Sequence, residues 1–285
     1  MTNMPIFQLG TRGSTLALKQ ANMVKDTLIQ AHPELDVRLQ VIETTGDQSG
    51  EDISVIGGKG VFIKEIEQAL LTGTIDCAVH SFKDITSQPH DSLTYSAFLL
   101  NERVTDAFIL FDNKTIHTDS LRIATGSMRR QALCEYLYPN IECIPIRGNI
   151  DTRIKKAREL NYDGLILSTA GLQRLNLDHK ISFEPDPCQF IPAPGQGMLA
   201  IQNRVDDTNT SQIIQSLREE KGHAMGCKYY EFLQGIAFNC NLPLGAYIND
   251  DQFHVFYKHH GAEYLSFSLS ELSSAIDSVK GAVHD

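Results

Sequence analysis

Residues 123–134 read IATGSMRRQALC and show how the chain is built. An apolar run ends at Thr125, Gly126 and Ser127 form a turn, and a helix follows. Residues 9–21, LGTRGSTLALKQA, have the same order of parts, and Ser14 can cap the helix there. A strand that turns directly into a helix is the basic unit of α/β folds, so the two segments predict two similar lobes.

The same alternation of strands and helices extends outward from both segments. Strands are expected at 5–10, 37–44, 75–81, 122–127 and 141–146 and at the start of 164–172, and helices at 16–32, 61–73, 128–138 and 151–160. This pattern predicts an α/β fold with a mostly parallel sheet and helices on both of its faces. Beyond about residue 218, three strand-like runs and a final helix predict a small α+β domain with an antiparallel sheet.

The composition disfavours several classes of protein. The 285 residues are 42% hydrophobic and 21% charged, as in globular proteins, and no apolar run is long enough to span a membrane. The formal net charge of −10 disfavours nucleic-acid binding. The first residues, MTNMPIFQLGTRGS, do not resemble a secretory signal, so a cytoplasmic protein is expected. The six cysteines are scattered, so neither a disulfide scaffold nor a metal site is expected.

Arginines gather in the segment 122–156 despite the acidic composition. Arg129 and Arg130 fall in the first turn of a predicted helix, where the helix dipole disfavours cations. An anion must offset that cost, and the unpaired N–H groups of a helix N-terminus also favour one. Arg147 and Arg153 follow the next strand, and the carboxyl ends of strands in an open α/β sheet share one edge. Solvated surface charge is the alternative, but the positions favour a site for carboxylates or phosphates.

Further polar residues follow two other predicted strands. Lys83 and Asp84 come just after the apolar run 75–79, and Arg12 and Ser14 come at the end of the first strand. These positions place them in the same predicted cleft as the arginines. Asp84 is a candidate general acid, or a group that stabilises a developing cation. A simple surface ion pair between Lys83 and Asp84 is the alternative.

Eight segments in series carry a further signal: TRGSTLALKQA (11–21), GGKGVFIKEIEQALL (57–71), AVHSFKD (78–84), ATGSMRRQAL (124–133), IRGNIDTRIKK (146–156), STAGLQRL (168–175), PAPGQGMLAI (192–201) and CNLPLGAY (240–247). They are spread over most of the chain. In this order they resemble the porphobilinogen deaminase family, whose members are also called hydroxymethylbilane synthases. The series is much more specific than any one of its segments.

The resemblance implies an activity and a cofactor. Members of the family condense four porphobilinogen molecules head to tail, release ammonia and give hydroxymethylbilane for tetrapyrrole and haem biosynthesis. Their cofactor is a dipyrromethane, built from the substrate and held by a cysteine thioether, and the matching cysteine here is Cys240. The resemblance also implies a cytoplasmic monomer that needs no metal, nucleic acid or membrane.

The resemblance gives roles to the residues at matching positions. Asp84 is the expected catalytic residue, which would protonate the leaving amine and then stabilise positive charge. The cofactor is expected to be held by Cys240, Lys59, Ser81, Lys83, Asp84, Thr125, Ser127, Arg129, Arg130, Arg147 and Arg153. The substrate is expected to be bound by Arg12, Ser14, Gln20, Phe62, Arg174 and Gln196. Arginines suit this role because each pyrrole ring brings an acetate and a propionate arm.

The family's fold, as the resemblance implies it, has three parts. Two are doubly wound lobes like those of periplasmic binding proteins, and the third is a small C-terminal α+β domain. The expected boundaries are 1–98 with 198–216 for lobe 1, 103–192 for lobe 2, and 218–285 for the domain that carries the cofactor-attachment cysteine.

The sequence departs from the family pattern at a few positions. Phe238 and Asn239 stand before the cysteine, where the family has two glycines. Thr105 stands where the family has an arginine, with Arg103 nearby as a substitute. Two alternatives to the family's activity therefore stay open. One is a divergent paralogue that makes a different oligopyrrole or lacks the cofactor, and the other is a non-catalytic two-lobed protein that binds carboxylates.

Overall fold

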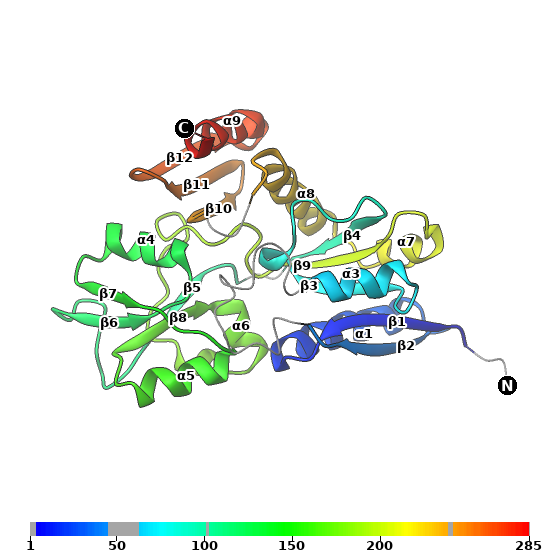
Figure 1. Ribbon diagram of the computed structural model, residues 1–285, viewed down its shortest axis with the longest axis horizontal. Helices are drawn as coiled ribbons and strands as arrows, with labels where there is room; N and C mark the ends of the chain where they lie inside the picture. The colour runs from blue at the N-terminus through cyan, green and yellow to red at the C-terminus, as the bar shows by residue number, and fades with distance from the viewer. Residues whose placement is uncertain (1–3, 45–62, 101–102, 239–241, 285) are drawn as a thin grey trace. The chain divides into compact units, whose positions relative to one another are not determined.

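The computed structural model describes residues 4–44, 63–100, 103–238 and 242–284 (Figure 1). The chain divides into two compact units, and each has its own sheet and core. Unit 1 comprises Met1–Asn101 and Met198–Cys227, and unit 2 comprises Glu102–Gly197 and Lys228–Asp285. The expected lobes 1 and 2 fall in different units, and the segment 218–285 divides between them. The three-domain boundaries stay a prediction.

The sheet of unit 1 has the strand order β2-β1-β3-β9-β4. Its strands are β1 (Ile6–Arg12), β2 (Asp36–Ile42), β3 (Cys77–Ser81), β4 (Leu93–Leu99) and β9 (Leu199–Arg204). As predicted, β1 runs parallel to β2 and β3. However, β9 runs antiparallel to β3 and β4, so the sheet is mixed. No crossover helix leads from β3 or β4 directly into β9, so nothing in the chain's path forces β9 to run parallel.

Helices cover both faces of this sheet, because successive side chains along its strands point to opposite faces and both sets are apolar. Cys77 and Val79 of β3 face the core under α1 (Thr15–Ala31) and α7 (Thr208–Gln215), while Ala78 faces α3 (Lys64–Leu71) on the other side. Ser14 caps α1 as predicted, since its side chain accepts a hydrogen bond from the N–H of Ala17. Gly73, with φ of 70°, ends α3.

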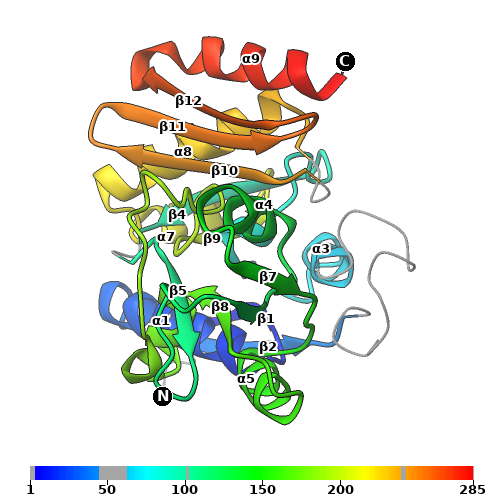
Figure 2. The same cartoon turned by 90° about the vertical axis from the view of Figure 1, so that its left-hand side faces the viewer.

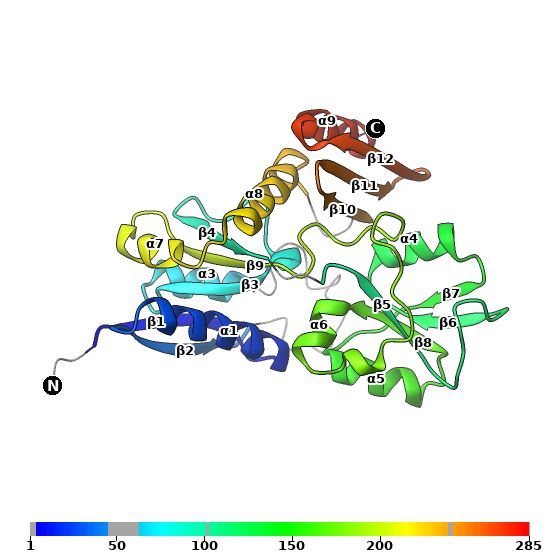
Figure 3. The ribbon, with the colours of Figure 1, turned by 180° about the vertical axis from the view of Figure 1, so that it is seen from behind.

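The sheet of unit 2 has the strand order β5-β8-β6-β7. Its strands are β5 (Asp106–Leu110), β6 (Leu121–Ala124), β7 (Ile141–Ile144) and β8 (Gly164–Ser168). β6 is parallel to β7 and β8, and β5 is antiparallel to β8. One face packs against α4 (Met128–Leu137), and the other packs against α5 (Ile150–Glu159) and α6 (Thr169–Arg174), as Figure 3 shows.

The C-terminal part has the predicted antiparallel sheet. β10 (Leu244–Asn249), β11 (Gln252–Lys258) and β12 (Ala262–Ser268) follow one another in order (Figure 2). Phe253 of β11 packs on Phe232 of α8 (Glu220–Gly235), with 4.9 Å between ring centroids. The final helix, α9 (Leu272–His284), packs against β11 and β12. Short 3₁₀ turns lie at Phe82–Asp84, Asp178–Lys180 and Leu269–Glu271.

Candidate active site

Unit 1 contains a polar pocket of about 70 Å³ at the ends of two parallel strands. β1 ends at Arg12, and β3 ends at Ser81. The pocket is lined by Arg12, Ser14, Leu16, Ala17, Gln20, Ile63, Val79, His80, Ser81 and Asp84. Five of these were predicted from the sequence, so the edge formed by the strand ends does bring them together. Among the described residues of unit 1, the pocket combines one cation, one carboxylate and several neutral polar groups.

Asp84 stands exposed on a short, well-anchored turn. The preceding Phe82 is fully buried, its N–H donates to the carbonyl oxygen of Met198 at 3.0 Å, and its ring lies 5.1 Å from that of Phe98. Because Phe82 is fixed in the core, the backbone that carries Lys83 and Asp84 is held in place. Both of these side chains are exposed. Asp84 can therefore meet a ligand without first breaking a buried contact.

Ser81 and Gln20 link the strand end to the first helix. Gln20 is buried, and its Nε2 lies 2.9 Å from Oγ of Ser81. This contact fixes α1 against β3 at the mouth of the pocket. His80, beside Ser81, is a pocket residue that received no role from the sequence. Burial lowers the pKa of His80 to about 4, the bond to Gln202 opposes this, and the charge of Arg12 adds to the decrease.

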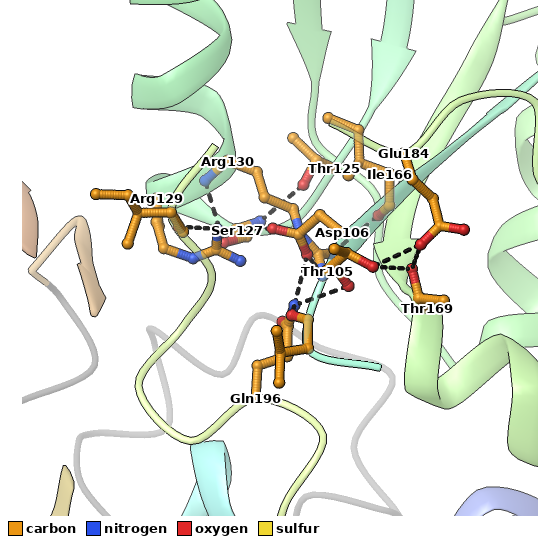
Figure 4. Close-up of polar contacts among 12 residues, drawn as sticks. Thr105, Asp106, Thr125, Ser127, Arg129, Arg130, Ile166, Thr169, Glu184 and Gln196 are labelled. Carbon is orange, nitrogen blue, oxygen red and sulfur yellow. Dashed lines mark hydrogen bonds and ion pairs between the residues drawn. The ribbon is translucent and has the colours of Figure 1, made fainter. Parts of the chain in front are cut away.

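Unit 2 contains a buried cluster of two arginines around one carboxylate (Figure 4). Arg129 NH1 lies 2.7 Å from Oδ2 of Asp106, and Arg130 donates to Oδ1 through Nε at 2.9 Å and NH2 at 2.7 Å. Backbone carbonyls complete the shell, with Ile166 accepting from Arg130 and Ile191 from Arg129. The anion that the helix start was expected to need is thus supplied in part by the chain itself.

Asp106 is wholly buried, and its role was not predicted from the sequence. Burial alone would raise its pKa, but the charges and hydrogen bonds of Arg129 and Arg130 outweigh this and hold the pKa well below the usual range for aspartate. Burial lowers the pKa of Arg129, and the charge of Asp106 opposes that decrease. Two cations and one anion leave the cluster with one net positive charge. An aspartate at the head of the apolar run AFIL was the available signal.

Gln196 belongs to the same cluster. Its Nε2 donates to Oδ1 of Asp106 at 3.0 Å and to the carbonyl oxygen of Val104 at 2.8 Å. Its Oε1 is buried without a hydrogen-bond partner among the described residues. Gln196 was predicted to bind substrate. In the structure its amide nitrogen is committed to Asp106, and only its oxygen is left for a ligand.

Glu184 holds together the residues before β5. Its carboxylate accepts from Thr105 at 2.6 Å and from Thr169 at 3.0 Å (Figure 4). It also pairs with Arg103. Arg103 therefore brings a guanidinium to the group that Thr105 also bonds. That Arg103 substitutes for the arginine that the family has at position 105 stays a prediction.

Four other predicted residues lie around the start of α4 and around the loop between β7 and α5. Ser127 caps α4 by accepting from the N–H of Arg130, and Thr125 Oγ1 accepts from the N–H of Ser127 at 3.2 Å. Arg147 is exposed. Arg153 of α5 donates from Nε to the carbonyl oxygen of Gly148 at 2.5 Å.

Arg174 is a mostly buried cation with no described carboxylate within ion-pair distance. Its NH2 donates to the carbonyl oxygen of Gly197 at 2.6 Å, while its Nε is buried without a described acceptor. Burial lowers its pKa to about 10. A buried guanidinium in this state is stabilised by an incoming anion.

Cys240, Lys59 and Phe62 lie outside the described residues. The structure nevertheless fixes the chain on both sides of Cys240. Before it, Ala237 adopts a left-handed φ of 47°, and the N–H of Phe238 donates to the carbonyl oxygen of Leu233, which ends α8. After it, the N–H of Ala246 in β10 donates to the carbonyl oxygen of Pro192 at 2.9 Å.

At Gly245, β10 packs closely on the segment Ile191–Pro192, which accepts a hydrogen bond from Arg129. A Cβ at Gly245 would lie 2.7 Å from the carbonyl oxygen of Ile191, the group to which Arg129 donates. Only glycine fits this approach. The strand that follows Cys240 is therefore packed against the arginine cluster through one peptide segment.

Comparisons with known proteins identify the family. Residues 7–212 match the family model described as "Porphobilinogen deaminase, dipyromethane cofactor binding domain". The porphobilinogen deaminase of Ehrlichia chaffeensis is 39% identical over 254 residues, which cover 87% of this chain and 85% of that protein. The porphobilinogen deaminase of Syntrophobacter fumaroxidans is 37% identical over 245 residues, covering 85% and 79%. The chain belongs to the porphobilinogen deaminase family.

A structural comparison gave a weaker likeness. A TRAP periplasmic solute binding protein from Desulfovibrio salexigens matches with a TM-score of 0.48 and 11% identity, over 80% of this chain and 76% of that protein.

The region that matches the porphobilinogen deaminase family model contains both the pocket of unit 1 and the arginine cluster of unit 2. The pocket around Asp84 and the arginines around Asp106 fall inside residues 7–212, whereas Cys240 lies beyond them. Among the described residues, no three His, Cys, Asp or Glu side chains form a group that could hold a metal ion. No helix in that part of the chain is long and apolar enough to cross a membrane.

Proposed function

We propose that this chain is a transferase that condenses four porphobilinogen molecules head to tail and releases ammonia, giving hydroxymethylbilane. The observation that carries the proposal is the pocket of unit 1, in which an exposed carboxylate, Asp84, stands on an anchored turn beside Arg12 and Ser81. Membership of the porphobilinogen deaminase family supports the substrate and the reaction.

In the proposed reaction, Asp84 stabilises the positive charge that develops on the substrate, and Arg12 binds one of its negatively charged carboxylates. Loss of ammonia leaves positive charge that spreads to the pyrrole nitrogen, and a carboxylate stabilises that charge as it develops. Asp84 can also pass a proton to the departing amine. Arg12 binds a carboxylate arm and so orients the ring. Ser81 and Gln20 add neutral hydrogen-bonding groups at the same strand end.

The residues of unit 2 fit a cofactor with several carboxylates. Arg129, Arg130 and Asp106 form a buried cluster with one net positive charge, and Arg174 is a further, partly buried cation without a described carboxylate. We assign the holding of a dipyrromethane to the predicted set of residues Lys59, Ser81, Lys83, Asp84, Thr125, Ser127, Arg129, Arg130, Arg147 and Arg153, with Cys240 as the thioether anchor. When bound, the dipyrromethane supplies the primer to which substrate units are added. As part of the same proposal, the protein is a cytoplasmic monomer.

Intact-mass spectrometry of the purified protein tests the attachment at Cys240. The expected result is a mass increase of two linked pyrrole units in the wild-type chain and no increase in Cys240→Ser. The variant is the matched control, because a hydroxyl is a poorer nucleophile than a thiol and Ser changes the volume little. An unmodified wild-type chain, purified after expression with a porphobilinogen supply, would contradict the attachment. If that chain still bound porphobilinogen without consuming it, the non-catalytic carboxylate-binding protein would be the better description.

Arg174→Met is expected to weaken the binding of porphobilinogen without lowering the stability of the fold. Methionine removes a partly buried charge that has no described counter-charge, so the free energy of unfolding should stay the same or rise. The KM for porphobilinogen should rise roughly 10- to 100-fold, because a charge-assisted contact to a carboxylate is lost.

Steady-state kinetics and urea denaturation measure both effects of Arg174→Met. The matched control is Arg158→Met, which removes an exposed arginine that lies 4.1 Å from the Phe111 ring centroid. We expect this control to leave the KM unchanged. An Arg174→Met enzyme with wild-type KM, or one that is strongly destabilised, would show that Arg174 serves the fold and not a ligand.

A further inference from the structure

His80 is a buried, titratable residue that lines the pocket and that the proposed function does not use. It lies on β3 between Val79 and Ser81, and only 6% of it is exposed. Its imidazole and the Tyr95 ring form a T-shaped contact with 6.3 Å between centroids. Together with Arg12 and Asp84, it lines the same cavity. A buried imidazole beside a reacting group is costly to keep unless its hydrogen bonds are satisfied.

Two neighbouring side chains determine which ring nitrogen of His80 carries the proton. Gln202, on β9, is fully buried, and its Oε1 lies 3.0 Å from Nε2 of His80. The amide nitrogen of Gln202 donates to Oε1 of Glu67 on α3 at 2.8 Å. Because the carboxylate of Glu67 only accepts, the NH₂ group of Gln202 must face it, and the amide oxygen must face His80. Nε2 of His80 is therefore the protonated nitrogen.

The other nitrogen, Nδ1, is left as a neutral acceptor. Burial and the charge of Arg12 keep the ring neutral at physiological pH, against the opposing effect of the bond to Gln202. The charged groups around it are Arg12 on β1, Asp84 on the turn after β3, and Glu67 behind Gln202. Among the described residues, no group forms a hydrogen bond with Nδ1.

We propose that Nδ1 of His80 binds the substrate by accepting a hydrogen bond from one of its N–H groups, either the pyrrole N–H or the aminomethyl group. The inference rests on the proposed function and extends it to a residue that carries no assigned role. Porphobilinogen has N–H donors as well as carboxylates. Arg12 suits the carboxylates, and a neutral acceptor suits the N–H group without adding a second anion near Asp84. A protonated His80 would instead repel both the amine and Arg12.

Two substitutions separate this role from a purely structural one. The amide oxygen of asparagine reaches the place of Nδ1, so His80→Asn keeps the acceptor and loses the bond to Gln202. The amide group of glutamine reaches the place of Nε2, so His80→Gln keeps that bond and loses the acceptor. We expect His80→Gln to lower kcat/KM roughly 10- to 100-fold, and His80→Asn to lower it by less than about 10-fold. The reverse order would overturn the proposal and assign His80 to the fold alone.

A second measurement does not depend on turnover. In ¹⁵N NMR of the wild-type protein, His80 is expected to be neutral with its proton on Nε2, and to stay so down to about pH 5. A proton on Nδ1 at pH 7, or a charged ring, would overturn the proposal even if both variants fold poorly. If the wild-type enzyme is active and His80→Gln matches it, only the role of His80 fails. If the wild-type chain does not consume porphobilinogen, the proposed function fails and this inference falls with it.

Discussion

Asp106→Asn is expected to lower the free energy of unfolding by about 3 to 5 kcal/mol, since one partner of a buried ion cluster is removed. The substitution leaves Arg129 and Arg130, which are 5% and 6% exposed, without a described carboxylate. It also replaces one of the two acceptor oxygens of the cluster by an NH₂ group, which donates and cannot accept from an arginine. Asparagine keeps the shape of the side chain, so the decrease in the free energy of unfolding measures the effect of removing the charge. Urea denaturation followed by circular dichroism measures it.

The matched control is Glu231→Gln on α8, which breaks a surface pair with Lys228 at 3.2 Å. Its expected cost is roughly 0.5 kcal/mol or less, because exposed pairs contribute little. Equal costs for the two variants would show that the cluster around Asp106 is not a significant source of stability.

The cluster also predicts a pH dependence of stability. The pKa of Asp106 is depressed in the folded state, so its contribution is complete above the unfolded pKa of about 4. The contribution is lost progressively as the pH falls below that value toward the lower folded pKa. Asp106→Asn should therefore lack part of the acid-induced decrease that the wild-type protein shows. Parallel curves for the two proteins below pH 4 would contradict the assignment.

Much of the fold could be predicted because local signals and packing agree. Ser14 and Ser127 both cap the helices that the sequence indicated, and the strand alternation at Cys77, Ala78 and Val79 matches the two faces of the sheet. The direction of β9 could not be predicted in this way. Its apolar run shows that a buried strand exists, but not which strands it joins or in which sense.

The site residues also divide into those that local signals could predict and those that depend on contacts between distant parts of the chain. Arg12, Ser14 and Asp84 were predicted together because the ends of parallel strands share an edge, and the three residues do line one pocket. The link between Asp106 and Gln196 spans 90 positions in the chain. No periodicity or motif indicates a contact between residues so distant in the chain. From the sequence, Asp106 could therefore be recognised only as the residue that starts a strand. The same holds for His80, whose protonation depends on Gln202 and Glu67 from two other elements.

Asp84→Ala is expected to lower kcat by roughly 10²- to 10⁴-fold while leaving the fold intact. The side chain is exposed, so its removal opens no cavity in the core, and Phe82 still anchors the turn. The loss falls on the chemical step, because the carboxylate interacts most strongly with positive charge that develops after binding. Single-turnover kinetics, on protein shown by mass spectrometry to carry its pyrrole units, measure that step separately from cofactor assembly.

The matched control for Asp84→Ala is Asp91→Ala, which removes another exposed carboxylate of unit 1 that does not line the pocket. It changes the net charge by the same amount, so any general electrostatic effect on the binding of an anionic substrate appears in both variants. We expect Asp91→Ala to retain the wild-type kcat. An Asp84→Ala enzyme within tenfold of wild type would remove Asp84 from the mechanism.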